Sequence, residues 1–332
     1  MKTKKPRIAL LGVGRFGSNH FRVLRELEKE NLCKLYGVVD IRDKILANIR
    51  ENYDIKTSTD YTDFLVDDVD AIDIVTPTGT HFDLCRECLK HEKHVFVEKP
   101  LTTNYMEAKK LVEIANKKKK TLMVGHIFRY NPAVWKIKEL IKKGKFGKIF
   151  YMIGHFHGLA NPRSDVGAMF NFASHHLDIY DNLLEKVPTE VACHTGHFLE
   201  RKEFEDLAVL LLRYPSNVFG IIEVSWLSPE KRRDLTVVGR SKSVTSNLLK
   251  QTLELHDIYM EKHKGELKAV DRGTTKIDVD YKEPLKLELL DFIKSIETGR
   301  KPLASGQAAL NVIKVAEKAL KSARLGKSVA IG

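Results

Sequence analysis

The stretch that decides the fold covers residues 7–40 and reads RIALLGVGRFGSNHFRVLRELEKENLCKLYGVVD. Its first apolar residues, 8–11, predict a short buried strand, and three glycines follow at G-x-G-x-x-G spacing. The amphipathic segment that comes next predicts a helix, and a second apolar segment, 35–39, ends in Asp40. A strand, a glycine-rich turn, a helix and a second strand in this order predict a βαβ unit.

Each glycine of the turn has a mechanical reason. Gly12 permits the tight turn out of the strand, Gly14 lets a pyrophosphate approach the backbone, and Gly17 lets the helix pack closely. The unpaired amides at the helix start, around Arg15 and Phe16, then face the phosphates. A glycine triplet alone is a weak signal, but its position between a strand and a helix predicts that these residues bind a dinucleotide.

Asp40 points to the kind of dinucleotide. It lies roughly 20 residues past the last glycine, where an acid accepts the ribose hydroxyls. Its carboxylate would repel a 2′-phosphate, so the sequence favours NAD over NADP. Arg42 would partly offset this repulsion, and we include it in the predicted cofactor site.

Composition limits the class of protein. The 332 residues suffice for two domains, and 43% hydrophobic with 30% charged residues is typical of a soluble globular protein. No apolar segment approaches the roughly 18 residues of a membrane span. The basic and then apolar start resembles a signal peptide, but its apolar part is short and continues directly into the glycine turn. We therefore expect a cytoplasmic protein without a membrane partner.

The net charge of +12 would suit a nucleic-acid partner, but the lysines are spread out and mixed with glutamates. The dense basic segment 117–120 falls at a predicted helix end, where cations suit the helix dipole. We therefore expect no nucleic-acid partner. Cys85 and Cys88 form a C-x-x-C, but both thiols share one face of a predicted helix, so core packing is favoured over redox or metal chemistry. We expect no metal site.

Two further turns follow predicted strands of the same sheet. The strand 70–75 ends in a Thr-Pro-Thr-Gly-Thr-His turn, and Thr80 would cap the helix that follows. The strand 94–97 ends in Glu98-Lys99-Pro100. An exposed ion pair at a strand exit is common, but ligands of doubly wound sheets bind at this edge. We therefore extend the predicted cofactor site to Thr76, Pro77, Thr80, His81, Glu98 and Lys99.

The alternation of strands and helices predicts a first domain, residues 1–125, with a doubly wound parallel sheet. A second α+β domain, residues 126–332, is rich in β-branched segments with period two, which predict a large, open and mostly antiparallel sheet. One helix, 170–184, interrupts these segments, and the helices 284–298 and 306–325 follow them. We expect another subunit to cover the open sheet, giving a homodimer or homotetramer.

The helix 170–184 carries the second set of candidate residues. Asn171 and His175 are four residues apart and share a face, and Asp178 is within reach. A histidine flanked by polar groups can act as a general acid or base at neutral pH, although a satisfied core histidine is the alternative. His175 and His176 point about 100° apart, so they cannot easily bind one metal ion. We predict that His175 is catalytic.

These elements together resemble the glucose–fructose oxidoreductase, inositol dehydrogenase and MocA family over nearly the full length. The resemblance implies NAD(P)-linked oxidation or reduction of a sugar or polyol hydroxyl, in which Lys99 orients and polarises the hydroxyl and His175 exchanges its proton. It rests on the glycine turn with Asp40, Thr76-Pro77-x-x-x-His81, Glu98-Lys99-Pro100, Gly125-His126, Arg129, Asn131-Pro132, the helix with His175, Leu303-Ala-Ser-Gly306 and Gly326-Lys327.

One position departs from the family pattern. The family usually has an aspartate four residues before the histidine, where this chain has Asn171. An asparagine can position a hydroxyl, but it cannot stabilise an imidazolium by charge. Activity could therefore be lower, the pH optimum could move, or Asp178 could supply the charge.

Within the family, three segments resemble the nucleotide-sugar branch: His126-Ile127-x-Arg129-x-Asn131-Pro132, Asn161-Pro162-Arg163 and Asp165-Val166-Gly167. That branch includes dehydrogenases that oxidise the C3 hydroxyl of UDP-N-acetylglucosamine or of its uronate. Arg129 and Arg163 would suit an anionic diphosphate, because a guanidinium binds phosphate at two points. The alternative, that both are ordinary surface arginines, has equal weight. The predicted substrate-binding residues are Lys99, Arg129, Asn131, Arg163, Asn171 and His175.

The sequence thus predicts an NAD-dependent dehydrogenase that acts on a sugar hydroxyl, with C3 of a UDP-linked amino sugar as the first choice. An inositol or free-aldose dehydrogenase of the same family is one alternative. A catalytically impaired NAD-binding sensor is another, and Asn171 motivates it.

Overall fold

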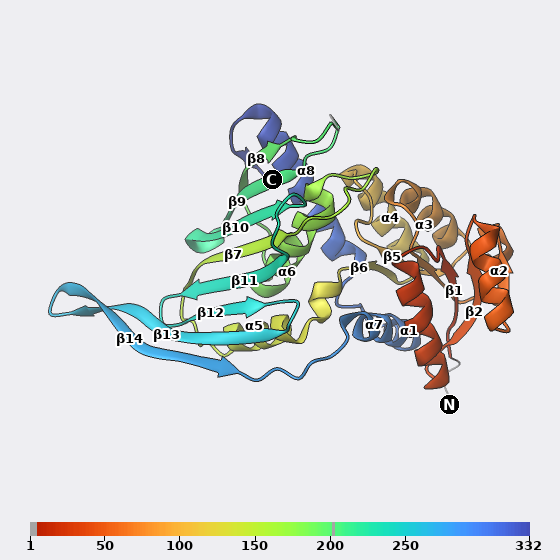
Figure 1. Cartoon of the computed structure of the whole chain (residues 1–332), viewed down its shortest axis with the longest axis horizontal. Helices are drawn as coiled ribbons and strands as arrows, with labels where there is room; N and C mark the ends of the chain where they lie inside the picture. The colour runs from red at the N-terminus through yellow and green to blue at the C-terminus, as the bar shows by residue number, and fades with distance from the viewer. Residues whose placement is uncertain (1–4, 201–202) are drawn as a thin grey trace. The chain divides into compact units, whose positions relative to one another are not determined.

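The computed structural model describes residues 5–200 and 203–332 (Figure 1). They belong to two compact units: Met1–Ile127 with Pro284–Leu310, and Phe128–Glu283 with Asn311–Gly332. The sequence places one division near residue 126, whereas in the structure a late segment returns to the first unit.

The first unit contains a six-stranded parallel sheet in the order β3-β2-β1-β4-β5-β6. The strand order reverses between β1 and β4, and ligands of doubly wound sheets bind at such a switch point. The glycine turn follows β1 and the Thr-Pro turn follows β4, so both lie where a ligand is expected. The strands are β1 (Arg7–Leu11), β2 (Lys34–Val39), β3 (Lys56–Ser58), β4 (Ala71–Ile74), β5 (His94–Glu98) and β6 (Leu122–Gly125).

A helix from late in the chain completes this unit. The ring of Phe292 lies 5.7 Å from that of Phe96 in β5, and the Lys286 ammonium lies 2.6 Å from the Glu30 carboxylate just after α1. Periodicity predicts a helix at 284–298 but does not tell which sheet it covers. The helical segments are α1 (Gly17–Lys29), α2 (Asp43–Asn52), η1 (Tyr61–Phe64), η2 (Thr78–Thr80), α3 (His81–Lys90), α4 (Tyr105–Lys118) and α7 (Pro284–Thr298).

The second unit contains a nine-stranded sheet in the order β14-β13-β12-β11-β7-β10-β9-β8-β15. β7 and β10 pair in parallel and the other neighbours pair antiparallel, as expected for a mostly antiparallel sheet. The strands are β7 (Ile149–His157), β8 (Glu190–Gly196), β9 (Leu207–Tyr214), β10 (Val218–Ser225), β11 (Arg232–Gly239), β12 (Ser243–Asn247), β13 (Thr252–His263), β14 (Glu266–Ile277) and β15 (Val329–Ala330).

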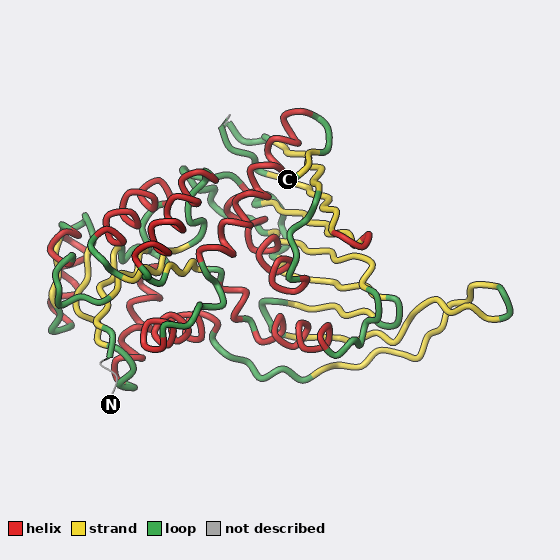
Figure 2. Tube along the Cα trace, turned by 180° about the vertical axis from the view of Figure 1, so that it is seen from behind, coloured by secondary structure: helices red, strands yellow, loops and turns green. Residues whose placement is uncertain are grey.

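The hairpin of β13 and β14 has two strands of 12 residues each, and Figure 2 shows it as a twisted two-stranded ribbon. β14 has no strand signal in the sequence, because nearly all its residues are exposed on both faces and it lacks the alternation of apolar and polar residues that marks a half-buried strand. Backbone pairing with β13 stabilises this strand, which has no buried face of its own.

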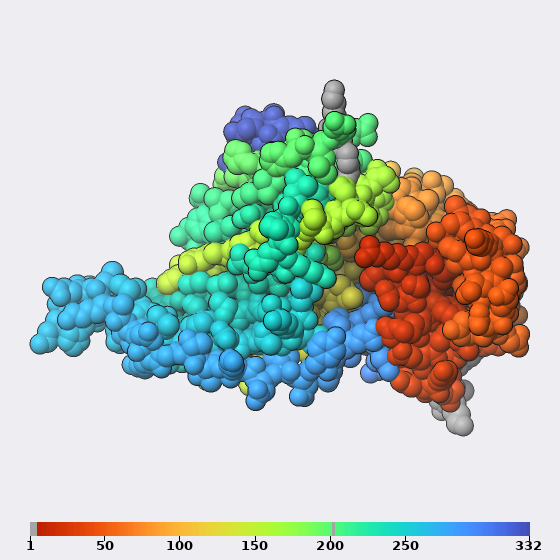
Figure 3. Space-filling model, in the orientation of Figure 1, coloured from red at the N-terminus to blue at the C-terminus, as the bar shows by residue number. Residues whose placement is uncertain are grey.

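Helices cover one face of this sheet. The alternate β7 residues Met152, Gly154 and Phe156 are buried, and a Cβ at Gly154 would collide with the His176 ring of α6. The opposite face carries half-exposed side chains, and Figure 3 shows them along β7 to β13 in green to cyan. The helical segments are η3 (Ile127–Tyr130), α5 (Pro132–Lys142), η4 (Met169–Ala173), α6 (Ser174–Leu184), η5 (Pro215–Asn217) and α8 (Gly306–Leu325). In the described part of the chain, no helix is long and apolar enough to cross a membrane.

Candidate active site

The glycine turn after β1 tolerates side chains at neither end. Gly12 has a φ of +91°, and a Cβ there would lie 2.6 Å from the Val75 carbonyl oxygen. A Cβ on Gly17 would collide with the carbonyl of Gly12. The turn out of β1 and the first turn of α1 therefore both depend on glycine, which brings the helix start close to the strand end.

A carboxylate and a guanidinium lie together beside this turn. Asp40 accepts hydrogen bonds from the Val13 amide at 3.0 Å and from Nε and Nη2 of Arg42, both at 2.9 Å. Burial raises the pKa of Asp40, but the bonds from Arg42 and Val13 outweigh it and lower that pKa below its usual value. The Arg42 side chain is 55% exposed and lies 3.4 Å from the position of a Cβ on Gly14. Arg15 and Phe16 are exposed in the same turn.

Thr80 does not cap α3, so that prediction is wrong. Its hydroxyl donates to the Pro77 carbonyl at 2.8 Å and lies 2.7 Å from the Thr76 hydroxyl. The reason is the short helical turn η2, which gives Thr80 a helical backbone (φ −97°, ψ −12°) instead of the extended one of a cap.

His81 connects this turn to the next strand end. The ring is buried, with Nδ1 2.8 Å from the Pro100 carbonyl oxygen and Nε2 2.9 Å from that of Thr76. His81 therefore braces the backbone of two candidate cofactor-binding segments.

Glu98 and Lys99 lie at the end of β5, and the Lys99–Pro100 peptide bond is cis. The Lys99 amide donates to the Glu98 carboxylate at 3.2 Å. Gly125 of the neighbouring β6 faces this carboxylate so closely that a Cβ would collide with it. The Glu98 side chain is thus held against the sheet edge, directly before Lys99.

A buried charge cluster lies behind Glu98, and sequence reasoning missed it. Nδ1 of His20 lies 2.9 Å from the Asp73 carboxylate, and Nε2 lies 3.3 Å from the Glu98 carboxylate. Burial lowers the pKa of His20, but Asp73 and Glu98 raise it to about 10. An imidazolium therefore lies between two carboxylates. The signal in the sequence is a histidine on the apolar face of the first helix and an aspartate within a buried strand.

In the second unit, His175 lies on an aromatic surface. Its ring stacks on Phe156 at 4.8 Å with an interplanar angle of 18°, and it meets Phe128 edge-on at 5.0 Å. A π-helical turn, Met169–Ala173, directly precedes α6 and contains Asn171. Such turns are rare and are frequent at functional sites.

The neighbouring His176 has a different role. Its Nε2 lies 2.8 Å from the Asp234 carbonyl oxygen of β11, and burial lowers its pKa to about 4. A neutral His176 therefore fixes α6 on the sheet, while His175 turns to the aromatic surface. This agrees with the expected divergence of the two side chains.

Arg129 forms a buried ion-pair cluster with α6. Its Nε lies 2.7 Å from Asp178 and its Nη2 lies 2.7 Å from Asp181, which also accepts from Asn311. Burial raises the pKa of Asp178 to about 6, although Arg129 opposes this shift. Asp181 was missed, although it lies one helical turn beyond Asp178. Phosphate binding by Arg129 remains a prediction, and two carboxylates already neutralise this guanidinium.

The other predicted substrate-binding residues also have internal partners. The oxygen of Asn131 accepts from the Ala133 amide and its amide donates to the Leu248 carbonyl, both at 2.9 Å, so it caps α5. Arg163 forms a two-point contact with Asp165 at 2.8 and 2.6 Å. Their contacts to substrate remain predictions.

Comparison with known proteins identifies the family. Residues 6–126 match the model of the glucose–fructose oxidoreductase, inositol dehydrogenase and MocA oxidoreductase family with an NAD-binding Rossmann fold, and residues 138–331 match its C-terminal α/β domain. The chain belongs to this family. The resemblance and the fold class predicted from the sequence are thereby confirmed, and the protein is an oxidoreductase.

Relatives of this oxidoreductase act on several cyclic alcohols. It is 26% identical over 340 residues to myo-inositol 2-dehydrogenase of Thermotoga maritima, covering 97% of this chain and 98% of that enzyme. It is 24% identical over 312 residues to UDP-N-acetylglucosamine 3-dehydrogenase of Acidithiobacillus ferrooxidans, covering 93% and 95%. A structure of levoglucosan dehydrogenase with NADH and levoglucosan has a TM-score of 0.86 at 19% identity, covering 99% and 100%, which shows the shared fold.

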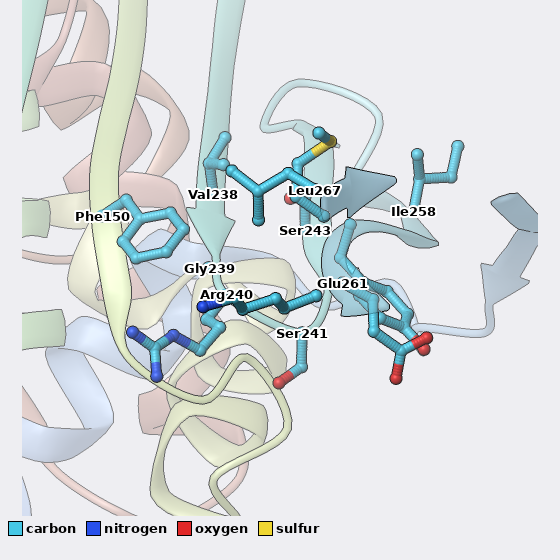
Figure 4. A pocket seen from close by; sticks show the side chains of 12 residues that line it. Phe150, Val238, Gly239, Arg240, Ser241, Ser243, Ile258, Glu261 and Leu267 are labelled. Atoms are coloured by element: carbon cyan, nitrogen blue, oxygen red, sulfur yellow. The ribbon is translucent and has the colours of Figure 1, made fainter. Parts of the chain in front are cut away.

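A separate hollow of about 780 Å³ lies on the second unit of the oxidoreductase (Figure 4). None of the predicted site residues lines it. Its lining includes the apolar side chains of Phe150, Val238, Ile258, Met260 and Leu267.

The His20 cluster predicts a pH dependence of stability. A histidine with a pKa of about 10 in the folded protein stabilises the fold fully below its unfolded pKa of 6.5. The stabilisation, on the order of a few kcal/mol, is lost as the pH rises toward 10. We expect the free energy of unfolding in urea to be higher for the wild type than for His20→Asn at about pH 6. This difference should become smaller as the pH is raised to about 9.5.

His91→Asn is the matched control, because His91 is exposed in the same unit and bonds only a backbone carbonyl at 3.0 Å. It should follow the wild type at every pH. A constant difference between wild type and His20→Asn would contradict the charged state assigned to His20.

Proposed function

We propose that this oxidoreductase transfers a hydride between NAD and a ring hydroxyl of a sugar, with C3 of a UDP-linked amino sugar such as UDP-N-acetylglucosamine as the preferred site. The observation that carries the proposal is His175, a histidine in the first turn of α6 that is held by stacking on Phe156 and follows a π-helical turn. Full-length relatives that act on an inositol and on UDP-N-acetylglucosamine support a cyclic alcohol as substrate.

The residues at the switch point of the first unit fit a dinucleotide. The glycine turn leaves a backbone free of Cβ atoms at Gly12, Gly14 and Gly17, and Asp40 offers a carboxylate at the end of β2. These residues would hold the pyrophosphate and the ribose. When bound, NAD supplies the hydride acceptor or donor.

The chain's own side chains would handle the proton. The Lys99 ammonium would orient the reacting hydroxyl and stabilise the developing negative charge on its oxygen. A ring nitrogen of His175 would accept the hydroxyl proton during oxidation and return it during reduction. The buried cluster of Glu98 and His20 would fix the backbone position from which Lys99 extends.

Asn171 would position a substrate hydroxyl without adding charge. The family's usual aspartate would bring a negative charge to this helix, whereas the Asn171 amide brings none. Asp178 cannot fully replace that aspartate, because its carboxylate already bonds Arg129 at 2.7 Å.

The first test is turnover with a substrate panel. UDP-N-acetylglucosamine, its uronate, myo-inositol and free hexoses are incubated with NAD, and NADH absorbance is followed. Lys99→Met and His175→Asn should each lower kcat on the active substrate by about 100- to 10,000-fold. Lys109→Met and His91→Asn, both exposed, are the controls and should retain wild-type rates.

The panel also separates the alternatives. If only myo-inositol or a free hexose is turned over, the enzyme is a dehydrogenase with that substrate, and the proposal of a UDP-sugar is wrong. Tight NAD binding without turnover of any sugar would favour a sensor and refute the dehydrogenase.

The second test concerns the cofactor. Asp40→Ser removes the carboxylate that bonds Arg42 and leaves the guanidinium able to meet a 2′-phosphate. The ratio of kcat/KM with NAD to kcat/KM with NADP should fall about 10- to 100-fold. Arg42→Met should raise this ratio instead. An unchanged ratio in Asp40→Ser would contradict NAD selection by this carboxylate.

We also propose that a second copy of the chain covers the hollow of the second unit, because Met260 and Leu267 expose apolar surface there. Light scattering should give the mass of a dimer or tetramer, and Leu267→Glu should lower that mass. Leu325→Glu, also at an exposed leucine, should not. A monomeric wild type would refute the proposal.

A further inference from the structure

Arg233 is a nearly buried cation on the helix-covered face of the large sheet. It lies in β11 opposite Phe156 of β7, and only 9% of the residue is exposed. The guanidinium carbon lies 3.4 Å from the Phe156 ring centre and 5.3 Å from that of Phe172. Nη1 donates to the carbonyls of Arg232 and His157. The group is thus fixed in place by two rings and two carbonyl oxygens.

No carboxylate among the described residues lies within ion-pair distance of Arg233. Burial lowers its pKa to about 10, and no neighbouring acid raises it again. The guanidinium nevertheless stays charged at neutral pH. In contrast, Arg129 pairs with two aspartates and Arg163 with one. Arg232, the neighbour of Arg233 in β11, pairs with Asp234.

A buried charge without a counterion is costly, so such a group indicates a role outside the resting fold. Stacking on Phe156 lowers the cost, because the face of an aromatic ring attracts a cation. The ring offers no negative charge that neutralises the guanidinium. An anionic ligand would supply it.

Arg233 is also close to the candidate catalytic group. The same Phe156 ring that it covers stacks on the imidazole of His175 at 4.8 Å. The guanidinium and the imidazole therefore lie against the two faces of one aromatic ring within the second unit. For Arg233 to contact a sugar that presents a hydroxyl to His175, a substituent elsewhere on the sugar ring must extend past the edge of Phe156.

We propose that Arg233 binds an oxyanion carried by the substrate's sugar ring, a carboxylate or a phosphate, and so selects anionic sugars over neutral ones. This rests on the proposed function, because it assumes that the substrate is a sugar that reacts at His175. A guanidinium suits this task, since it binds carboxylate and phosphate at two points.

The experiment compares sugars that differ by one anionic group. D-Glucuronate and D-glucose 1-phosphate are each paired with D-glucose, and UDP-N-acetylglucosamine uronate is paired with UDP-N-acetylglucosamine. Binding is measured by calorimetry and turnover by NADH absorbance, with wild type, Arg233→Met, Arg233→Lys and the control Arg232→Met. The arm that depends on Arg233 distinguishes a carboxylate from a phosphate.

The wild type should bind the charged member of at least one pair more tightly. Arg233→Met should weaken that binding on the order of 10- to 100-fold and leave the neutral member nearly unchanged. The affinity of Arg233→Lys for the charged sugar should lie between those of the wild type and Arg233→Met, because lysine keeps the charge but loses the two-point geometry. Arg232→Met should match the wild type, since its side chain lies on the opposite sheet face.

Equal losses for charged and neutral sugars in Arg233→Met, or a wild type without preference for charge, would overturn the inference. If Arg233→Met fails to fold, the wild-type preference and Arg233→Lys decide the matter. Retained sugar turnover with no charge preference would reject the inference alone. Absent turnover with charge-selective binding that Arg233→Met abolishes would reject the dehydrogenase and keep the anion site.

Discussion

The close approach of α6 to the large sheet at Gly154 is the constraint on which the second unit depends. A side chain at that position would collide with His176, which bonds the backbone of β11 at 2.8 Å. This contact fixes the rotation of α6 about its axis. His175, one residue earlier, must then face Phe156 and Phe128. One missing Cβ in a strand thus sets the direction of the candidate catalytic imidazole.

A buried ion-pair cluster supports the candidate residue in each unit. His20 with Asp73 and Glu98 lies behind Lys99, and Arg129 with its two aspartates grips α6 one turn beyond His175. Buried ion pairs are a poor source of stability, because desolvation offsets the attraction. Breaking one by removing a partner nevertheless costs about 3–5 kcal/mol. Such clusters therefore restrict the positions of the segments that carry Lys99 and His175, which suits side chains that must be oriented for a reaction.

The sequence predicted what is local and missed what is distant. The strand, glycine turn and helix were predictable because spacing alone defines them. β14 was not, because an exposed strand has no buried face to read. The helix 284–298 was predicted, but its packing on α1 joins residues more than 250 positions apart, such as Lys286 and Glu30.

The same limit explains the candidate site. Arg129 and Arg163 were chosen for their charge and their motifs, and the structure gives both of them carboxylate partners. For Arg129 the partners are 49 and 52 residues away, so the sequence could not reveal them. Arg233 follows Arg232 in β11, and successive side chains of a strand point to opposite faces of the sheet. The sequence does not show which of the two arginines is buried.

Whether an arginine already pairs with a carboxylate therefore indicates better than its charge alone whether it is available to an anionic ligand. In this basic protein with a net charge of +12, an arginine as such carries little information. An arginine that is buried, held by aromatic rings and lacking an acid is different, because its free energy is lowered when an anion arrives. The hydride transfer proposed here assigns its roles to Lys99 and His175 and uses no such group. A cation placed beside His175 would instead distinguish members of one family by the charge of the sugar they accept.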